Sequence, residues 1–139
     1  IEDIERQVFD ENSNVDILVA LQASGALQGV WPSVEINGKH FFDGGSFSME
    51  NPDVFVDADK MLVLSTGLPV DVPYKLEDLL AQLEKKGTET SLVLPSEKTM
   101  NILKDFNYNM VEAKIRPFVA QAGREQGQAE AALIKERWL

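Results

Sequence analysis

Asp43 is the residue of this chain whose neighbours best suit it to do chemistry. It is followed by Gly44 and Gly45, and two residues without a Cβ can adopt positive φ and leave open space beside the carboxylate. A general base needs such space, because a hydroxyl from another chain segment and a substrate must both reach it. Asp-Gly-Gly is also typical of an ordinary turn, so a plain loop stays open as the alternative.

His40 is the single histidine, so a Ser-His-Asp triad would have to use it as the base. It precedes Asp43 by three positions, and an odd separation in a continuous strand places two side chains on opposite faces. We therefore predict a solvent-facing hairpin residue rather than a triad member. One histidine cannot build a metal site without several carboxylates beside it. Asp57-Ala58-Asp59 lacks the glycine and the distal glutamate of a calcium loop, and we expect a solvated turn there.

The sequence contains no nucleophile elbow, in which a serine lies between two glycines at a strained turn from a strand to a helix. Two segments have glycines four positions apart, but their central residues are Leu27 and Glu125, and neither can be the nucleophile. Gly44-Gly45 is not followed by a third glycine or by the Lys-Ser/Thr pair of a phosphate-binding loop. Cysteine is also absent, which excludes a thiol nucleophile and a cysteine-ligated metal. We expect no metal and no cofactor.

Composition narrows the class of protein further. The 139 residues are 44% hydrophobic and carry a formal net charge of −10, which indicates a globular chain with enough apolar material for a core. The acidic balance argues against nucleic acid as a partner, because phosphate binding depends on basic side chains. The longest apolar runs, such as residues 61–64, are far shorter than the roughly 20 residues of a membrane span. The lack of cysteine is consistent with a reducing compartment, and we expect a cytoplasmic location.

The elements that must position Asp43 begin with a helix and a hairpin. Asn14 is the expected N-cap of a short, mostly apolar and buried helix over residues 15–23, which should stop near Gly25. Residues 33–42 place Asn37-Gly38 between two short runs of β-forming residues. This is the strongest local hairpin signal, because a type I′ turn requires positive φ at both central positions. Asp43 directly follows the second strand of that hairpin.

The second half of the chain has the pattern of alternating strands and helices. An apolar run without alternation suits a strand covered on both faces, as in a parallel sheet. Leucines at 76, 79, 80 and 83 form the stripe of an amphipathic helix. Pro117 and Gly123 are expected to interrupt the last helix. The order indicates an α/β layered domain: strand 60–65, helix 74–86 ended by Gly87, strand 90–94 stopped by Pro95, and helix 111–138.

The stretch from Ala23 to Gly45 strongly resembles the block around the catalytic aspartate of patatin-like phospholipases. It has the same order of small residues, glycine, an aromatic-proline pair, an apolar pair, an Asn-Gly turn, an aromatic residue and Asp-Gly-Gly. Asn51-Pro52-Asp53 and residues 57–64 look like the family's asparagine-containing loop and its next parallel strand. Residues 122–138 are similar to the chain end of some bacterial members, so the resemblance extends from Asn14 to the end.

The resemblance implies a fold and an activity. Members of that family are serine acyl hydrolases with a Ser–Asp dyad, and residues 1–139 would be the C-terminal portion of one such domain, a three-layer α/β/α fold with a mostly parallel sheet. Asp43 inherits the role of the base, with Gly44 and Gly45 as supporting residues. The serine and the loop of the oxyanion hole would lie in the upstream half of the same protein. The implied substrate is an ester or a phospholipid, and the chain alone would be inactive.

Two further expectations accompany this interpretation. Gln28 stands where many members have proline, Trp31 where phenylalanine is commoner, and Asn51 lies two positions farther from Asp43 than in familiar members; these departures affect loop shape rather than the dyad aspartate. The first residues lack an initiating Met and a signal peptide, so we expect a trimmed or processed chain with an exposed apolar face or an unpaired strand edge. The alternative is a non-catalytic acidic binding or interaction module.

Overall fold

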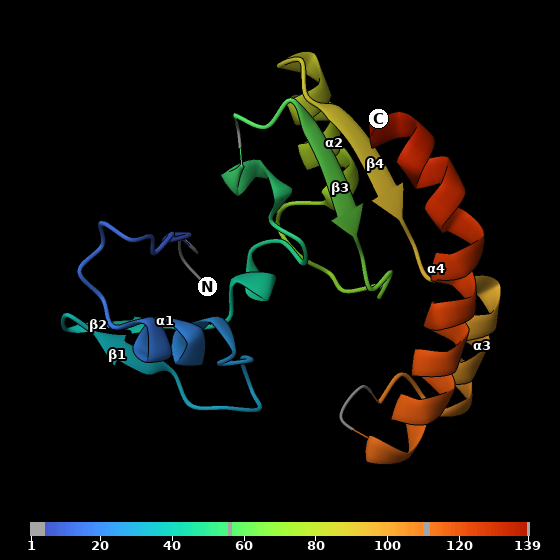
Figure 1. The fold of residues 1–139 in the computed structure, drawn as a ribbon. Helices are drawn as coiled ribbons and strands as arrows, with labels where there is room; N and C mark the ends of the chain where they lie inside the picture. The colour runs from blue at the N-terminus through green and yellow to red at the C-terminus, as the bar shows by residue number, and fades with distance from the viewer. Residues whose placement is uncertain (1–4, 56, 110–111, 139) are drawn as a thin grey trace. The chain divides into compact units, whose positions relative to one another are not determined.

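The chain is a mixed α/β protein in a computed structural model that describes residues 5–55, 57–109 and 112–138 (Figure 1). It divides into two compact units. The first unit comprises Ile1–Asp59 and Pro69–Thr90, and the second comprises Lys60–Leu68 and Ser91–Leu139. The elements are α1 (Ile17–Ser24), β1 (Val34–Ile36), β2 (Lys39–Phe41), η1 (Gly44–Ser46), η2 (Pro52–Val54), β3 (Lys60–Leu64), α2 (Leu76–Lys85), β4 (Glu89–Val93), α3 (Glu97–Asp105), η3 (Ala113–Ile115) and α4 (Arg116–Trp138).

The hairpin of the first unit confirms the sequence-based prediction. β1 and β2 pair antiparallel, with Val34 opposite Phe41 and Glu35 opposite His40. The turn residues Asn37 and Gly38 have φ of 52° and 76°, the two positive values that the type I′ turn requires. Asparagine tolerates this region and glycine enters it without a steric cost, so the dipeptide alone fixes the register of the strands.

The predicted N-cap of α1 is wrong. Asn14 has a φ of 51°, whereas an N-cap residue has extended backbone. The cap is Asp16, whose Oδ1 accepts hydrogen bonds from the backbone N–H groups of Leu18 at 2.8 Å and Val19 at 3.4 Å. Both residues have cap-forming side chains, and spacing alone did not distinguish them. The predicted end at Gly25 is confirmed.

The predicted burial of α1 is also wrong for this chain. Ala23 is the buried residue of the helix, while Ile17, Leu18 and Leu21 are 61–71% exposed. α1 packs against β1 in the first unit, and one short strand covers only part of a helix that is apolar on most sides. The apolar composition that predicted burial therefore remains as exposed surface.

β3 and β4 form a parallel pair whose arrows point the same way in Figure 1. The backbone N–H of Glu89 donates to Asp59 O at 2.8 Å at one end, and the N–H of Ser65 donates to Val93 O at 3.0 Å at the other. Parallel strands need a crossover connection, and α2 lies in it. The predicted strand, helix, strand order is confirmed, with β4 shifted by one residue from the predicted range.

The predicted covering of β3 on both faces is not observed. Met61 and Val63 are buried, but Leu64 is 70% exposed. Among the described residues, β3 has β4 as its one neighbouring strand. The expectation of exposed apolar surface is confirmed in each unit taken by itself, by the side chains of α1 in the first and by Leu64 in the second. No helix within the described residues is both long and apolar enough to cross a membrane.

α2 confirms the leucine stripe. Leu79, Leu80 and Leu83 are its buried residues, and the helix packs against η2 in the first unit. Thr88 N–H donates to Leu83 O at 3.1 Å beyond the end of the helix. Gly87, with a φ of 102°, supplies the left-handed residue that this reversal requires.

The second unit contains a helix that the sequence analysis missed. α3 begins after Ser96, whose hydroxyl accepts from Thr99 N–H at 3.3 Å; serine after proline, with an acidic residue next, is a recognisable start signal. α3 packs against α4. Val111, at which the predicted last helix begins, lies outside the described residues. α4 runs through Pro117 and Gly123 without interruption, because proline in the first turn loses no helical hydrogen bond.

Candidate functional site

The Asp43 turn is tied to the elements on either side of it. Asp43 lies two residues after the end of β2, and its N–H donates to Ala26 O, just beyond α1, at 3.1 Å. Its carboxylate Oδ1 accepts from Gly45 N–H at 2.7 Å and thereby caps η1. The side chain is half-buried. Asp43 therefore has a fixed backbone and a carboxylate that the turn itself orients.

The two glycines act differently from the sequence-based expectation. Neither Gly44 nor Gly45 is among the described residues with positive φ, so the backbone does not require glycine for its conformation. A Cβ on Gly45 would lie 3.0 Å from Asp43 Oδ1, closer than ordinary van der Waals contact. The predicted positive φ is therefore wrong. The space that the missing Cβ of Gly45 leaves is taken by the Asp43 carboxylate, which folds back onto the turn.

Asp43 and Gly44 lie in the wall of a pocket in the first unit. Its volume is about 680 Å³, within the usual range of small-molecule sites. Large apolar side chains from α1, the hairpin and the flanking segments line most of it: Phe9, Ile17, Leu21, Phe41, Phe42 and Phe47. These side chains can accommodate a hydrocarbon chain, and Asp43 lies in the same wall.

His40 lies where the sequence predicts. It is exposed and opposite Glu35 in the hairpin, and its Nδ1 lies 3.1 Å from Ser33 Oγ. It lines the rim of the same pocket, but its partner is Ser33 rather than Asp43. The solvent-facing role is confirmed, and this geometry provides no Asp–His pair for a triad.

Two serines that no sequence pattern singles out line the pocket. Ser24 is the last residue of α1, and Ser46 is the last residue of η1. Neither lies at a turn from a strand into a helix, which is the position that exposes an elbow serine. Their hydroxyls add polar groups to a largely apolar wall, and no sequence motif marks them.

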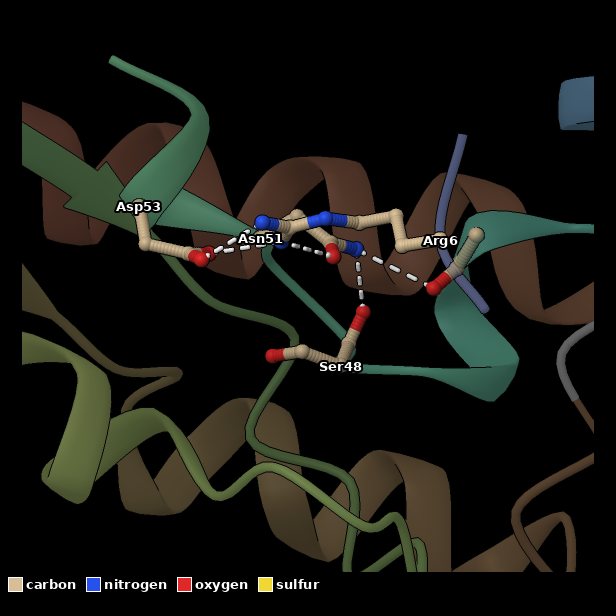
Figure 2. A network of polar contacts seen from close by, with 5 residues as sticks. Arg6, Ser48, Asn51 and Asp53 are labelled. Carbon is tan, nitrogen blue, oxygen red and sulfur yellow. Dashed lines mark hydrogen bonds and ion pairs between the residues drawn. The ribbon is translucent and has the colours of Figure 1, made fainter. Parts of the chain in front are cut away.

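A second missed feature is a polar network beside the Asp43 turn (Figure 2). Arg6 donates from Nη1 and Nη2 to the two carboxylate oxygens of Asp53, at 2.7 and 2.6 Å, and from Nη1 to Asn51 Oδ1 at 3.0 Å. The amide of Asn51 donates to Gly44 O at 3.1 Å and to Ser48 O. We call Arg6, Asn51 and Asp53 the Arg6 network. Arg6 lies more than forty residues before the other two members in sequence, so local spacing gives no sign of the network.

The Arg6 guanidinium is held by an aromatic contact as well. It lies 4.6 Å from the ring centre of Phe47, a favourable cation–π distance. The Phe47 ring stacks on Tyr74 with centres 4.0 Å apart, and Tyr74 N–H donates to Phe47 O at 3.2 Å. The guanidinium therefore has partners both in its plane and against its face.

The Arg6–Asp53 pair shifts the titration of both groups. The hydrogen bonds from Arg6 hold the pKa of the Asp53 carboxyl below its ordinary value, against the opposing effect of burial. The same hydrogen bonds raise the pKa of Arg6, which stays charged throughout. Both side chains are only 21–23% exposed, and a bidentate pair of this kind is among the stronger charge-assisted contacts.

This shift predicts an acid-sensitive contribution to stability. Because the pKa of Asp53 is lower in the folded chain, the pair stabilises the fold fully above the ordinary aspartate pKa of about 3.9, and the contribution is lost as the pH falls through the folded value. We expect Asp53→Asn to lower the free energy of unfolding in urea at pH 7, with a difference from wild type that shrinks below pH of about 4.

The matched control is Glu125→Gln. The hydrogen bond from Lys98 lowers the pKa of Glu125 as well, but this pair is exposed on both sides and exposed pairs contribute little. We expect no measurable change in the urea midpoint for this variant. A difference between Asp53→Asn and wild type that is the same at pH 7 and at pH of about 3 would contradict the assignment to the ion pair.

The acidic segment Asp57-Ala58-Asp59 is predicted to form a solvated turn rather than a cation site. Asp57 and Asp59 lie in an exposed turn, as expected, and the described part of the chain contains no group of three or more His, Cys, Asp or Glu side chains that could hold a metal ion. Comparison of the chain with known protein families, with curated proteins and with solved structures finds no match. The interpretation of the site therefore depends on its geometry and on the resemblance of residues 23–45 to the aspartate block of patatin-like phospholipases.

Proposed function

We propose that this chain supplies the general base of a patatin-like serine acyl hydrolase, with Asp43 as the base and Gly44 and Gly45 as supporting residues. The observation that carries the proposal is the position of Asp43 in the wall of a pocket of about 680 Å³ whose lining includes six large aromatic and aliphatic side chains. An ester or phospholipid substrate suits this combination, because its acyl chain requires apolar contacts and its carbonyl requires an attacking hydroxyl.

The chemistry divides between Asp43 and a serine in the upstream half of the intact protein. The serine Oγ attacks the ester carbonyl, its proton passes to the Asp43 carboxylate, and the alcohol leaves with a proton as the acyl-enzyme forms. Water then attacks the acyl-enzyme and gives its proton to the same carboxylate, which passes it to the serine Oγ as the acid is released. A carboxylate is a weak base toward a serine hydroxyl, so the orientation of the Asp43 side chain matters greatly for this step.

The exposed apolar surface supports an upstream half that docks on this chain. Ile17, Leu18 and Leu21 of α1 are mostly exposed, and Ile17 and Leu21 also line the pocket. Soluble proteins rarely leave such clusters uncovered. A three-layer α/β/α domain with a mostly parallel sheet would cover them and would extend the β3–β4 pair, and we propose that fold for the intact protein.

A fluorophosphonate probe tests the proposal, because it labels an activated serine covalently. We expect the longer protein that includes the upstream half to be labelled at a serine in that half, and residues 1–139 alone to stay unlabelled. Ser24→Ala and Ser46→Ala are the controls for the two serines of the pocket. Labelling that either substitution removes, or a longer protein that takes up no probe, would overturn the proposal.

The second candidate is a non-catalytic acidic binding or interaction module. The observation that favours it is the same exposed face of α1 on a chain with a net charge of −10, which could bind a partner without any reaction. The two candidates differ in the upstream coding sequence. A Gly-x-Ser-x-Gly segment after a strand supports the hydrolase, whereas its absence supports the binding module.

A further inference from the structure

We propose that Asn51 and Arg6 are positioning residues that hold the Asp43-Gly44-Gly45 turn in the geometry that a general base requires. This inference rests on the proposed function, and it concerns how the base is oriented rather than whether the reaction takes place. Arg6 lies outside the stretch that resembles the family, whereas Asn51 belongs to its asparagine-containing loop. The contacts of both residues lie wholly in the first unit (Figure 2).

Asn51 is the residue that contacts the turn directly. Its backbone is left-handed, with a φ of 47°, and its side chain makes no capping hydrogen bond to η2, which follows it. The amide instead donates to Gly44 O at 3.1 Å and to Ser48 O. Gly44 C=O and Gly45 N–H belong to the same peptide unit. The bond from Asn51 therefore fixes the unit whose N–H donates to the Asp43 carboxylate.

Arg6 determines which way the Asn51 amide faces. Its Nη1 donates to Asn51 Oδ1 at 3.0 Å, so the amide nitrogen is directed toward Gly44. The guanidinium is itself fixed by both oxygens of Asp53 and by the ring of Phe47. Lysine keeps the charge but cannot make this bidentate fork or the flat stacking contact. The fixed guanidinium therefore orients the Asn51 amide, and the amide in turn holds Gly44 O in the turn.

The Gly45 N–H reports directly on the result. It donates to Asp43 Oδ1 at 2.7 Å, so it is protected from exchange with solvent only while the carboxylate keeps this orientation. Its exchange rate thus measures the position of the base without any catalytic activity. A residue with a merely structural role elsewhere would leave this amide unchanged at equal stability.

The experiment is amide hydrogen exchange by NMR on wild type and three variants of the 139-residue chain. Asn51→Asp keeps the size, the tolerance for left-handed backbone and an oxygen for Arg6, but it cannot donate to Gly44. Arg6→Lys removes the pair of hydrogen bonds from the guanidinium to Asp53. Arg124→Lys, at an exposed position of α4, is the matched control. We expect Gly45 N–H to exchange on the order of tenfold to a hundredfold faster in Asn51→Asp, less markedly faster in Arg6→Lys, and unchanged in Arg124→Lys.

The outcomes separate clearly. Unchanged exchange at Gly45 in both Asn51→Asp and Arg6→Lys overturns the inference. If Asn51→Asp unfolds the first unit, exchange at Thr88 N–H will be faster as well. The test then depends on Arg6→Lys, and unchanged exchange at Gly45 in that variant overturns the inference. In the longer protein, both substitutions should lower kcat with KM little changed. A wild-type protein that hydrolyses no ester would overturn the proposed function, but it would leave the exchange result at Gly45, and so the positioning role, intact.

Discussion

Replacing Asp43 by asparagine is expected to slow ester hydrolysis by the intact protein about 10²- to 10⁴-fold, the range in which a positioned general base contributes. The amide oxygen of asparagine can still accept from Gly45 N–H, so the turn should keep its geometry. Asparagine cannot take the serine proton, however. The measurement is kcat/KM for a neutral monomeric ester, together with circular dichroism to establish that the variant is folded.

Asp57→Asn is the control for this substitution. Asp57 lies in an exposed turn away from the pocket wall, and its loss removes the same charge from the chain. We expect its kcat/KM to equal that of wild type. An Asp43→Asn variant with undiminished hydrolysis would show that the carboxylate is not the base, and the hydrolase interpretation of this site would then have no residue to carry it.

The hairpin shows what local sequence can predict. Asn37-Gly38 determines the turn type, the turn type determines the register, and the register places Asp43 at the end of β2. The leucine stripe of α2 is equally local, because helical periodicity depends on residues three and four apart. Each of these predictions needed only the residues of the element itself.

The network around the turn could not be predicted in the same way. Arg6 meets Asn51 and Asp53 across more than forty residues, and contacts of that kind follow from the three-dimensional path of the chain rather than from spacing. The apolar residues of α1 present the opposite case. Their composition predicted burial, but burial requires a partner surface, and the short strand β1 that packs against α1 covers little of it.

Leu83→Ala is expected to produce the largest loss of stability among substitutions of the first unit's core. Leu83 is 1% exposed on α2, and alanine there loses the transfer free energy of the leucine and leaves a cavity. The expected cost is about 2–5 kcal/mol in the free energy of unfolding. Because α2 packs against η2, which carries Asp53, the substitution should also loosen the Arg6 network. Urea unfolding measures the first effect, and exchange at Gly45 measures the second.

Leu21→Ala is the matched comparison, because the same atoms are removed from a side chain that is 61% exposed on α1. In residues 1–139 alone we expect a change within about 0.5 kcal/mol. In the longer protein the expectation differs: an upstream half that docks on α1 would bury Leu21, and the same substitution would then cost about 2 kcal/mol or more. Equal, small effects in both proteins would show that this face stays exposed, which would favour a binding module over a shared hydrolase domain.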